Sequence, residues 1–257
     1  MILTVDIGNT NITCGLFDGE TLVKQFRLDS NKELDVNEYS RTFSYELGDI
    51  KPEGAVIGSV VEELNNKIQY SILATYGVKA HILSSDSVMP IKITVPNPKE
   101  VGADRLANAI RAYNIYHRAV IVVDLGTATT FDIVNGKGEF IGGLIAPGVE
   151  TQLKSLNIST SKLPDIEPQP INTSIGNNTK DAILSGVIRG TASMVDGMIE
   201  KSIDELKEEP VIIATGGYSK LITKYTKTNF DKIYPYLTLE GLRDLFSENK
   251  PLQPIFE

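Results

Sequence analysis

Two short segments of the chain combine an aspartate, a glycine and hydroxyl side chains at the point where an apolar run ends. They are residues 6–10 (DIGNT) and residues 124–127 (DLGT). Glycine lets the backbone bend sharply and approach a ligand closely, while backbone N–H groups and threonine hydroxyls can donate to phosphate oxygens. An aspartate beside a polyanion needs a cation between them, so Asp124 is a candidate metal ligand. Taken alone, either segment could instead be an ordinary hairpin turn rich in Gly and Thr.

The same succession of elements surrounds both segments. In each copy an apolar run leads into the Asp-x-Gly turn, and a second apolar-rich run leads to a Gly-Glu turn, at residues 19–20 in the first and 138–139 in the second. This pattern predicts two β-hairpins. Because the copies are separated by about half the chain, we expect two related domains, residues 1–117 and 118–257, each with one phosphate-binding turn.

A third group with chemical potential is Gly102-Ala103-Asp104-Arg105, which follows an extended, proline-containing segment and opens a predicted helix. Free N–H groups and the dipole at a helix start favour an anionic substrate group. The carboxylate could accept the proton of an attacking hydroxyl, and the guanidinium could hold a substrate carboxylate through two hydrogen bonds. The dipeptide alone is more typical of a solvated ion pair at a helix start.

Apolar periodicity predicts the elements that must position these groups. Strands are expected at residues 22–28, 55–61, 119–123 and 210–217, helices at 35–47, 62–76, 100–115, 149–156 and 239–246, and an extended loop at 163–173. Gly58 and Ser59, where a strand ends, could line a cleft or form a simple strand-to-helix turn. The paired glycines at 216 and 217 could admit a flat ring or a sugar against the backbone.

A further helix is expected to begin after Thr179, a reasonable N-cap. Ala182, Gly186 and Gly190 recur at four-residue spacing and give this helix a narrow face of small side chains. Such a face suits either a tight contact within the chain or a dimer interface.

Composition narrows the class of protein. The chain has 257 residues, 41% of them hydrophobic, and a net charge of −8, which argues against general nucleic-acid binding. Since no apolar stretch approaches the ~20 residues that span a bilayer, we expect a cytoplasmic protein with no membrane partner. The single cysteine, Cys14, is expected to fill space rather than act as a nucleophile. His81 and His117 have no ligand partner at useful spacing and are expected to be structural.

The chain resembles the actin-like ATPase and sugar-kinase superfamily and, within it, the type III pantothenate kinases. The signatures that carry the resemblance span nearly the whole chain in the right order: residues 6–10 (DIGNT), 97–98 (NP) with 101–108 (VGADRLAN), 124–130 (DLGTATT), 142–143 (GG) with 147–148 (PG), and 214–217 (ATGG). The resemblance implies an α/β fold with two duplicated actin-like (ribonuclease H-like) ATPase domains and a central cleft. It also implies ATP-dependent phosphorylation of pantothenate to 4′-phosphopantothenate, the first step of coenzyme A biosynthesis.

The resemblance also implies roles for individual residues. ATP would be bound by Asp6, Ile7, Gly8, Asn9, Thr10, Asn11, Ile12, Thr13 and Thr127. Pantothenate would be bound by Gly102, Ala103, Asp104, Arg105 and Thr179. Asp104 would be the general base, and Asp124 would ligate the monovalent cation, K⁺ or NH₄⁺, that the family needs besides Mg²⁺, with Asp6 as a second metal-binding residue. The family's site is completed across a homodimer.

One departure and two alternatives qualify this interpretation. Many relatives have an aromatic residue that contacts the substrate where this chain has Val95, so the packing of pantothenate is in doubt. A non-catalytic regulatory relative, a transcriptional accessory factor, is disfavoured because such a protein would not need Asp6, Asp104 and Asp124 together. A kinase for a sugar or an acetate-like acid is disfavoured by the short chain and by the Gly-Ala-Asp-Arg turn.

Overall fold

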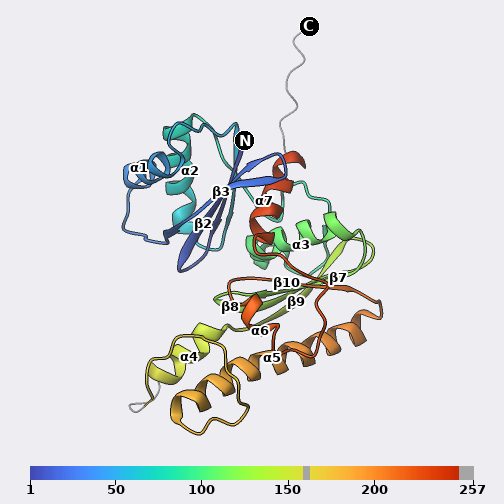
Figure 1. The fold of residues 1–257 in the computed structure, drawn as a ribbon. Coiled ribbons are helices and arrows are strands. Elements are labelled where there is room, and N and C mark those ends of the chain that lie inside the picture. Colours follow the sequence, from blue (N-terminus) through green and yellow to red (C-terminus); the bar gives the residue numbers. More distant parts are fainter. Residues whose placement is uncertain (159–162, 249–257) are drawn as a thin grey trace. The chain divides into compact units, whose positions relative to one another are not determined.

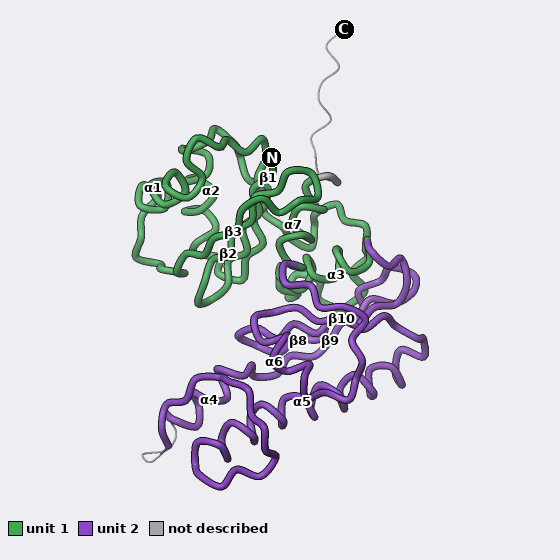
Figure 2. The backbone as a smooth tube through the Cα atoms, in the orientation of Figure 1, with its two compact units in different colours: residues 1–114, 237–257 green, residues 115–236 purple. Residues whose placement is uncertain are grey.

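The computed structural model describes residues 1–158 and 163–248, which form two compact units (Figure 2). Unit 1 comprises Met1–Asn114 together with the segment from Leu237, and unit 2 comprises Ile115–Tyr236. The division after residue 114 lies close to the expected domain boundary at 117 and 118. The C-terminal helix differs from that expectation, because its contacts are with unit 1.

Unit 1 is built on a mixed sheet with the strand order β3-β2-β1-β4-β5 (Figure 1). Neighbours β1, β2 and β3 are antiparallel, whereas β4 is parallel to β1 and β5 is parallel to β4. The strands are β1 (Ile2–Ile7), β2 (Asn11–Asp18), β3 (Thr21–Asp29), β4 (Gly54–Ser59) and β5 (His81–Ile82), and the short β6 (Lys92–Ile93) follows them. The helices of the unit are α1 (Val36–Leu47), α2 (Glu62–Tyr76), the 3₁₀ turn η1 (Pro98–Glu100), α3 (Ala103–Tyr116) and α7 (Leu237–Glu248).

Helices cover both faces of this sheet. Side chains that alternate along β1 and β4, such as Val5 and Ile57, form one apolar cluster with Phe43 of α1 and Ile68 of α2. On the opposite face α7 packs against β1 and β4. At Gly58 a Cβ atom would lie 2.9 Å from Leu242 of α7, so the missing side chain allows α7 to pack closely against β4.

Helix α7 also holds α3. The two helices approach so closely that a Cβ atom at Gly241 would lie 2.0 Å from the carbonyl oxygen of Ala107. Beside this contact Arg111 donates through Nε to Glu240 (2.9 Å) and through its terminal nitrogen to Asp244 (3.2 Å). These partly buried ion pairs fix the helix whose first turn contains the Asp-Arg pair.

Unit 2 repeats the sheet of unit 1. Its strands lie in the order β11-β10-β7-β8-β9, with antiparallel pairs from β7 to β9 and parallel pairs from β7 to β11. The elements are β7 (Val120–Leu125), β8 (Ala128–Val134), β9 (Glu139–Pro147), α4 (Val149–Ile158), α5 (Thr179–Leu206), β10 (Val211–Thr215), α6 (Ser219–Ile222) and β11 (Lys232–Ile233). The predicted duplication is therefore present strand by strand.

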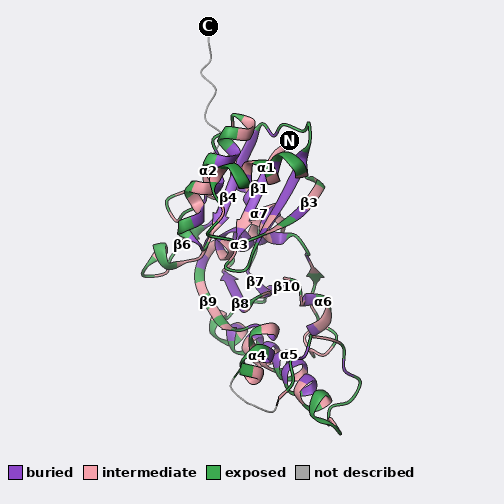
Figure 3. Cartoon of the chain, turned by 90° about the vertical axis from the view of Figure 1, so that its left-hand side faces the viewer, coloured by how far each residue is buried: buried purple, intermediate pink, exposed green. Residues whose placement is uncertain are grey.

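The long helix α5 belongs to the core of unit 2. Its apolar side chains, including Leu184, Ile188 and Val195, form one cluster with Val123 and Phe131 of the sheet. By length and composition alone α5 is the one helix of the described residues that could cross a membrane, but this clustering is typical of a core helix. Figure 3 shows the buried stretches along it.

Two expectations about the start and face of α5 are corrected. The N-cap is Asn178, whose side chain accepts from the backbone N–H of Asp181 (3.0 Å), so Thr179 is the first helical residue instead. The face of small side chains is exposed, and Cβ atoms at Gly186 and Gly190 would meet nothing within 4 Å. A tight contact within the chain is therefore wrong for this face.

Candidate functional site

The first glycine turn lies at the carboxyl end of β1. Asp6 is paired with Thr13 of β2 on one side and with Gly58 of the parallel strand β4 on the other. The backbone N–H of Gly8 donates across the turn to the carbonyl of Asn11 (3.0 Å). Residues 9–11 of this turn are exposed. The turn therefore exposes polar residues 9–11 to solvent at the end of a buried strand, where a phosphate loop is expected.

Ser30, the first residue after β3, secures this turn. Its hydroxyl donates to the carbonyl of Gly8 (2.5 Å), and its backbone N–H donates to the carbonyl of Thr10 (3.1 Å). The expected ATP-binding residues 6–13 thus form one continuous structure: the end of β1, the secured turn and the start of β2.

Unit 1 also brings the Gly-Ala-Asp-Arg segment towards this end of the sheet. The N–H of Val60, just after β4, donates to the carbonyl of Ile7 (3.1 Å), and a Cβ atom at Gly102 would lie 3.4 Å from the Val60 side chain. Three segments far apart in sequence therefore meet: the ends of β1 and β4 and the start of α3.

The carboxylate of Asp104 is oriented at the start of α3. Its Oδ1 atom accepts from the backbone N–H of Arg105 (2.8 Å) and lies over Gly102, where a Cβ atom would be only 2.4 Å away. A residue with a side chain at position 102 would displace this carboxylate. Both members of the Asp104-Arg105 pair are half-buried, so each remains accessible to a substrate.

The second glycine turn has the same place at the end of β7 in unit 2. Asp124 is paired with Thr130 of β8 and with Thr215 of the parallel strand β10. The N–H of Gly126 donates across the turn to the carbonyl of Ala128 (3.0 Å). The expected ATP-binding residue Thr127 is exposed at the tip of this turn.

The carboxylate of Asp124 lies directly against two glycines. A Cβ atom at Gly216 would lie 2.4 Å from Oδ1 of Asp124, and one at Gly126 would lie 3.2 Å from it. Gly216 also has a φ of +88°, which favours glycine. Among the described residues no group of three or more His, Cys, Asp or Glu side chains could hold a metal ion. One carboxylate between two threonines of neighbouring strands offers oxygen atoms, the ligands that hard cations accept.

Thr179 lies in a different part of unit 2. It is exposed at the start of α5 and borders an apolar groove whose other lining residues are Leu156, Leu163, Ala182, Ile183, Gly186 and Val187. Neither Asp124 nor Thr127 lines this groove. Within one unit the structure therefore does not join Thr179 to the other expected site residues.

Comparison with known proteins decides the family. The family model for type III pantothenate kinase matches residues 2–201. A type III pantothenate kinase of Citrifermentans bemidjiense is 37% identical over 255 residues, covering 97% of this chain and 100% of the relative. The chain belongs to the type III pantothenate kinase family.

Solved structures agree with this fold. A protein of Campylobacter jejuni described as a Baf family transcriptional activator matches with a TM-score of 0.61 at 21% identity, covering 96% of this chain and 98% of that one. A ROK hexokinase of Thermus thermophilus matches with a TM-score of 0.51 at 12% identity, covering 95% and 97%. Identities this low show the fold alone. They confirm the expected α/β fold with duplicated actin-like ATPase domains.

Membership in the type III pantothenate kinase family confirms that the chain is an enzyme, a kinase of coenzyme A biosynthesis that uses ATP and a divalent metal ion. The regulatory alternative is not favoured, because the similarity to named kinases extends over nearly the full chain. The roles of individual residues in this type III pantothenate kinase stay predictions.

Sequence reasoning gave no role to the residues that support the two turns, although Gly148 belongs to the signature at residues 147–148. Ser30 and Gly148 are the first residues after β3 and β9, and the backbone N–H of each donates to a threonine carbonyl of its turn, Thr10 (3.1 Å) or Thr127 (3.2 Å). An alignment of the two internal repeats could have found this pair, because both follow the third strand. Thr151 was also missed; its hydroxyl donates to Thr127 (2.9 Å), and no motif marks it.

Proposed function

We propose that this chain transfers the γ-phosphoryl group of ATP to the primary hydroxyl of pantothenate in the cytoplasm, as a homodimer that needs Mg²⁺ and a monovalent cation, K⁺ or NH₄⁺. The observation that carries the proposal is the repeated hairpin, which places an Asp-x-Gly turn at the end of a buried strand in each unit, next to an oriented Asp104 in unit 1. Phosphoryl transfer needs alignment, neutralised charge and a destination for one proton, and little covalent chemistry.

Residues 6–13 and Thr127 are proposed to bind ATP. The hydroxyls of Thr10 and Thr127, which are exposed in the two turns, are suitable donors to phosphate oxygens. Asp6 would hold the divalent ion and Asp124 the monovalent cation, which supply positive charge beside the phosphates. The place of Asp124 at the end of β7, next to the exposed residue Thr127 of the same turn, supports the second assignment.

Asp104 is proposed as the general base and Arg105 as the residue that holds the pantothenate carboxylate. As the pantothenate oxygen bonds to the γ-phosphorus, the bond from that phosphorus to the bridging oxygen of ADP breaks. The hydroxyl proton passes to Asp104. The N–H of Arg105 leaves the second oxygen of this carboxylate available, since the bond that it donates is to Oδ1.

The homodimer proposal rests on α5. The small-residue face and its groove are exposed, and Ile158 and Ile175 in the same unit are 82% and 87% exposed. Thr179 borders this groove, so a partner seated there would approach an expected pantothenate contact. Small side chains allow two helices to approach closely. Sedimentation of the wild-type protein tests this directly, and a fully active monomer at assay concentration would refute it.

A coupled assay of ADP release, with and without pantothenate, tests the reaction. We expect release to depend on pantothenate and to disappear when sodium or a bulky organic cation replaces potassium at constant ionic strength. Release that ignores pantothenate would refute the substrate. Release that ignores the cation exchange would leave Asp124 as a structural or magnesium-binding residue.

A further inference from the structure

The second turn is held from two sides by backbone groups. On one side the N–H of Tyr218, beyond the end of β10, donates to the carbonyl of Leu125 (2.9 Å). On the other side the carbonyl of Thr127 accepts from the N–H of Gly148 (3.2 Å) and from the hydroxyl of Thr151 (2.9 Å). Gly148 directly precedes α4, so the position of this turn depends on both α4 and the segment after β10.

One side-chain hydrogen bond joins these two sides. The Tyr218 hydroxyl donates to Oε1 of Glu150, in the first turn of α4. The circuit is closed: from the Leu125 carbonyl to Tyr218, through its side chain to Glu150, back along α4 to Gly148, and from there to Thr127. Burial, followed by the bond to Glu150, raises the pKa of Tyr218, so the hydroxyl keeps its proton and remains the donor.

The first turn has the backbone bonds of this circuit but not its side-chain link. There the N–H of Val60 donates to Ile7 (3.1 Å) and the N–H of Ser30 donates to Thr10 (3.1 Å). Val60 has no hydroxyl, so this position cannot form the equivalent of the tyrosine bond. The link is therefore a particular feature of the turn that contains Asp124 and Thr127.

We propose that Tyr218 and Glu150 are positioning residues for the second phosphate turn. Their hydrogen bond fixes the distance between α4 and residues 216–218, the segment after β10. This distance in turn determines the positions of the Thr127 backbone and the Asp124 carboxylate. The inference rests on the proposed binding of ATP and the cation by these two residues. A displacement of a few tenths of an ångström in groups that must align with a phosphate is enough to weaken binding and transfer.

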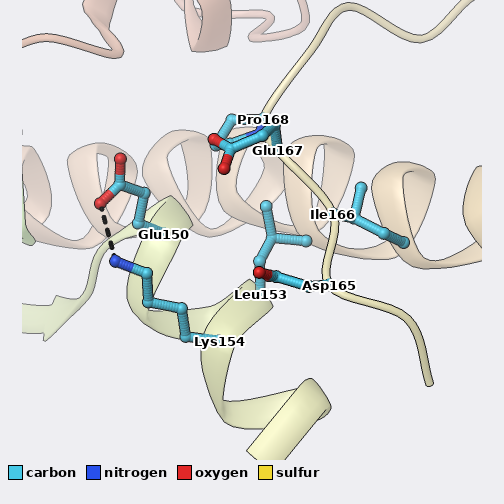
Figure 4. Close-up of a pocket in the computed structure, with 7 residues that line it drawn as sticks. All are labelled: Glu150, Leu153, Lys154, Asp165, Ile166, Glu167 and Pro168. Atoms are coloured by element: carbon cyan, nitrogen blue, oxygen red, sulfur yellow. Dashed lines mark ion pairs between the residues drawn. The ribbon is translucent and has the colours of Figure 1, made fainter. Parts of the chain in front are cut away.

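Glu150 has a second partner that serves as a control. Figure 4 shows it on the rim of a small pocket, where its other oxygen, Oε2, lies 3.5 Å from Nζ of Lys154. The Lys154 side chain is 66% exposed, and ion pairs at such a surface contribute little. If Glu150 positions the turn through Tyr218, replacing Lys154 should leave ATP and cation binding unchanged.

The test measures the KM for ATP, the KM for pantothenate and the activation constant for potassium in single and double variants. We expect Tyr218→Phe and Glu150→Ala each to raise the ATP KM and the activation constant for potassium about tenfold, because each removes a hydrogen bond to a charged carboxylate, which is stronger than one between neutral groups. The pantothenate KM should stay within about twofold of the wild-type value. The double variant should resemble the single ones, because either change opens the same circuit. Glu150→Gln, which keeps an acceptor oxygen, should restore most of the loss.

Matched controls are Lys154→Ala and Tyr225→Phe. The Tyr225 hydroxyl accepts from the N–H of Ile171 (2.8 Å) in the same unit and lies outside the circuit. Both controls should keep all three constants within about twofold. Unchanged constants in Tyr218→Phe, additive losses in the double variant, or an equal rise in every constant would overturn the proposal. The assay of the wild-type protein tests the proposed function separately, because it shows whether ADP release depends on pantothenate at all. Direct titration of the variants with ATP tests the role of the Tyr218–Glu150 hydrogen bond even if pantothenate is not the acceptor.

Discussion

The β1–β2 and β7–β8 hairpins have the same backbone hydrogen bonds but differ in the length of the turn and in the side chains that hold it. In both, an aspartate precedes the last residue of the first strand, and a glycine N–H closes the turn. The last paired residues are Ile7 and Ile12 in unit 1 but Leu125 and Thr129 in unit 2, so the first turn holds residues 8–11 and the second only 126–128. The longer turn leaves its tip more exposed.

The difference suggests a division of labour between two copies of one structure. Backbone bonds that position the turn are common to both, because they follow from strand pairing and from the residue after the third strand. Side chains vary: Ser30 secures the first turn, whereas Thr151, Tyr218 and Glu150 secure the second. We therefore expect the second turn, which has more side-chain hydrogen bonds, to be held more rigidly than the first.

The largest expected effect concerns Asp104, the proposed general base. In α3 the pair Asp104-Arg105 directly follows the first helical residue, Ala103, whereas α7, the helix after β11, starts with Leu237-Thr238. We expect Asp104→Asn to keep the fold and ATP binding while lowering kcat at least ~10²-fold, the effect of losing a general base. Circular dichroism and ATP titration check the first two, and initial rates the third.

Its control is Glu63→Gln, which removes an exposed carboxylate from the first turn of α2 in the same unit. This variant should keep kcat close to the wild-type value. A folded Asp104→Asn enzyme with near-normal kcat would exclude Asp104 as the base.

The next largest effect compares two glycines, Gly216 beside Asp124 and Gly58 beside Asp6. Gly216→Ala should lower the free energy of unfolding by about 1–3 kcal/mol, because its φ of +88° strains an alanine and the new Cβ would lie 2.4 Å from Asp124 Oδ1. It should also reduce activity by more than tenfold. Gly58→Ala should cost less, because the nearest atom, at 2.9 Å, is the end of the flexible Leu242 side chain.

Urea unfolding and ADP-release rates on both alanine variants make this comparison. Equal losses of stability and activity at positions 216 and 58 would show that the second turn is no more tightly packed than the first.

A smaller effect compares the hydroxyls that secure the turns. Ser30→Ala should cost about 1 kcal/mol, the value of one hydrogen bond, and raise the ATP KM a few-fold, because Gly8 loses its side-chain donor. Thr151→Ala should change both quantities less, since Thr127 keeps the N–H of Gly148 as a donor. Denaturation midpoints and ATP titrations decide between them, and the reverse order would contradict the division of labour.

The smallest effect distinguishes the edge strands. Burial lowers the pKa of His81 in β5, whereas the equivalent strand β11 contains Lys232 and Ile233. The pKa of His81 in the folded protein is below its value of 6.5 in the unfolded chain. The neutral imidazole therefore contributes stability that is complete above pH 6.5 and is lost as the pH falls from 6.5 towards the folded-state pKa. His81→Gln should therefore flatten the decline of the urea midpoint between pH 7.5 and about 5.5, and an unchanged decline would assign it to other groups.

Sequence alone predicted the hairpins and the placement of each aspartate, because strand alternation and Gly-Glu turns are local signals. It could not predict that α7 joins unit 1. The amphipathic pattern of a helix shows that one face is buried but not which sheet buries it. Gly58 was ambiguous for the same reason, since its partner Leu242 lies in α7. Side-chain circuits such as Tyr218 to Glu150 depend on distances that no pattern encodes.

The membership of α7 in unit 1 has a consequence for synthesis of the chain. Unit 2 is one uninterrupted stretch, Ile115–Tyr236, whereas unit 1 lacks the helix that covers β1 and β4 until the residues after Leu237 leave the ribosome. We therefore expect unit 2 to become protease-resistant on the nascent chain before unit 1 does, although unit 1 is translated first. Limited proteolysis of stalled chains would show the order, and early protection of unit 1 would contradict it. Until residues 237–248 have left the ribosome, the face of β4 that contains Gly54 and Gly58 is not covered by α7 and stays open to chaperones.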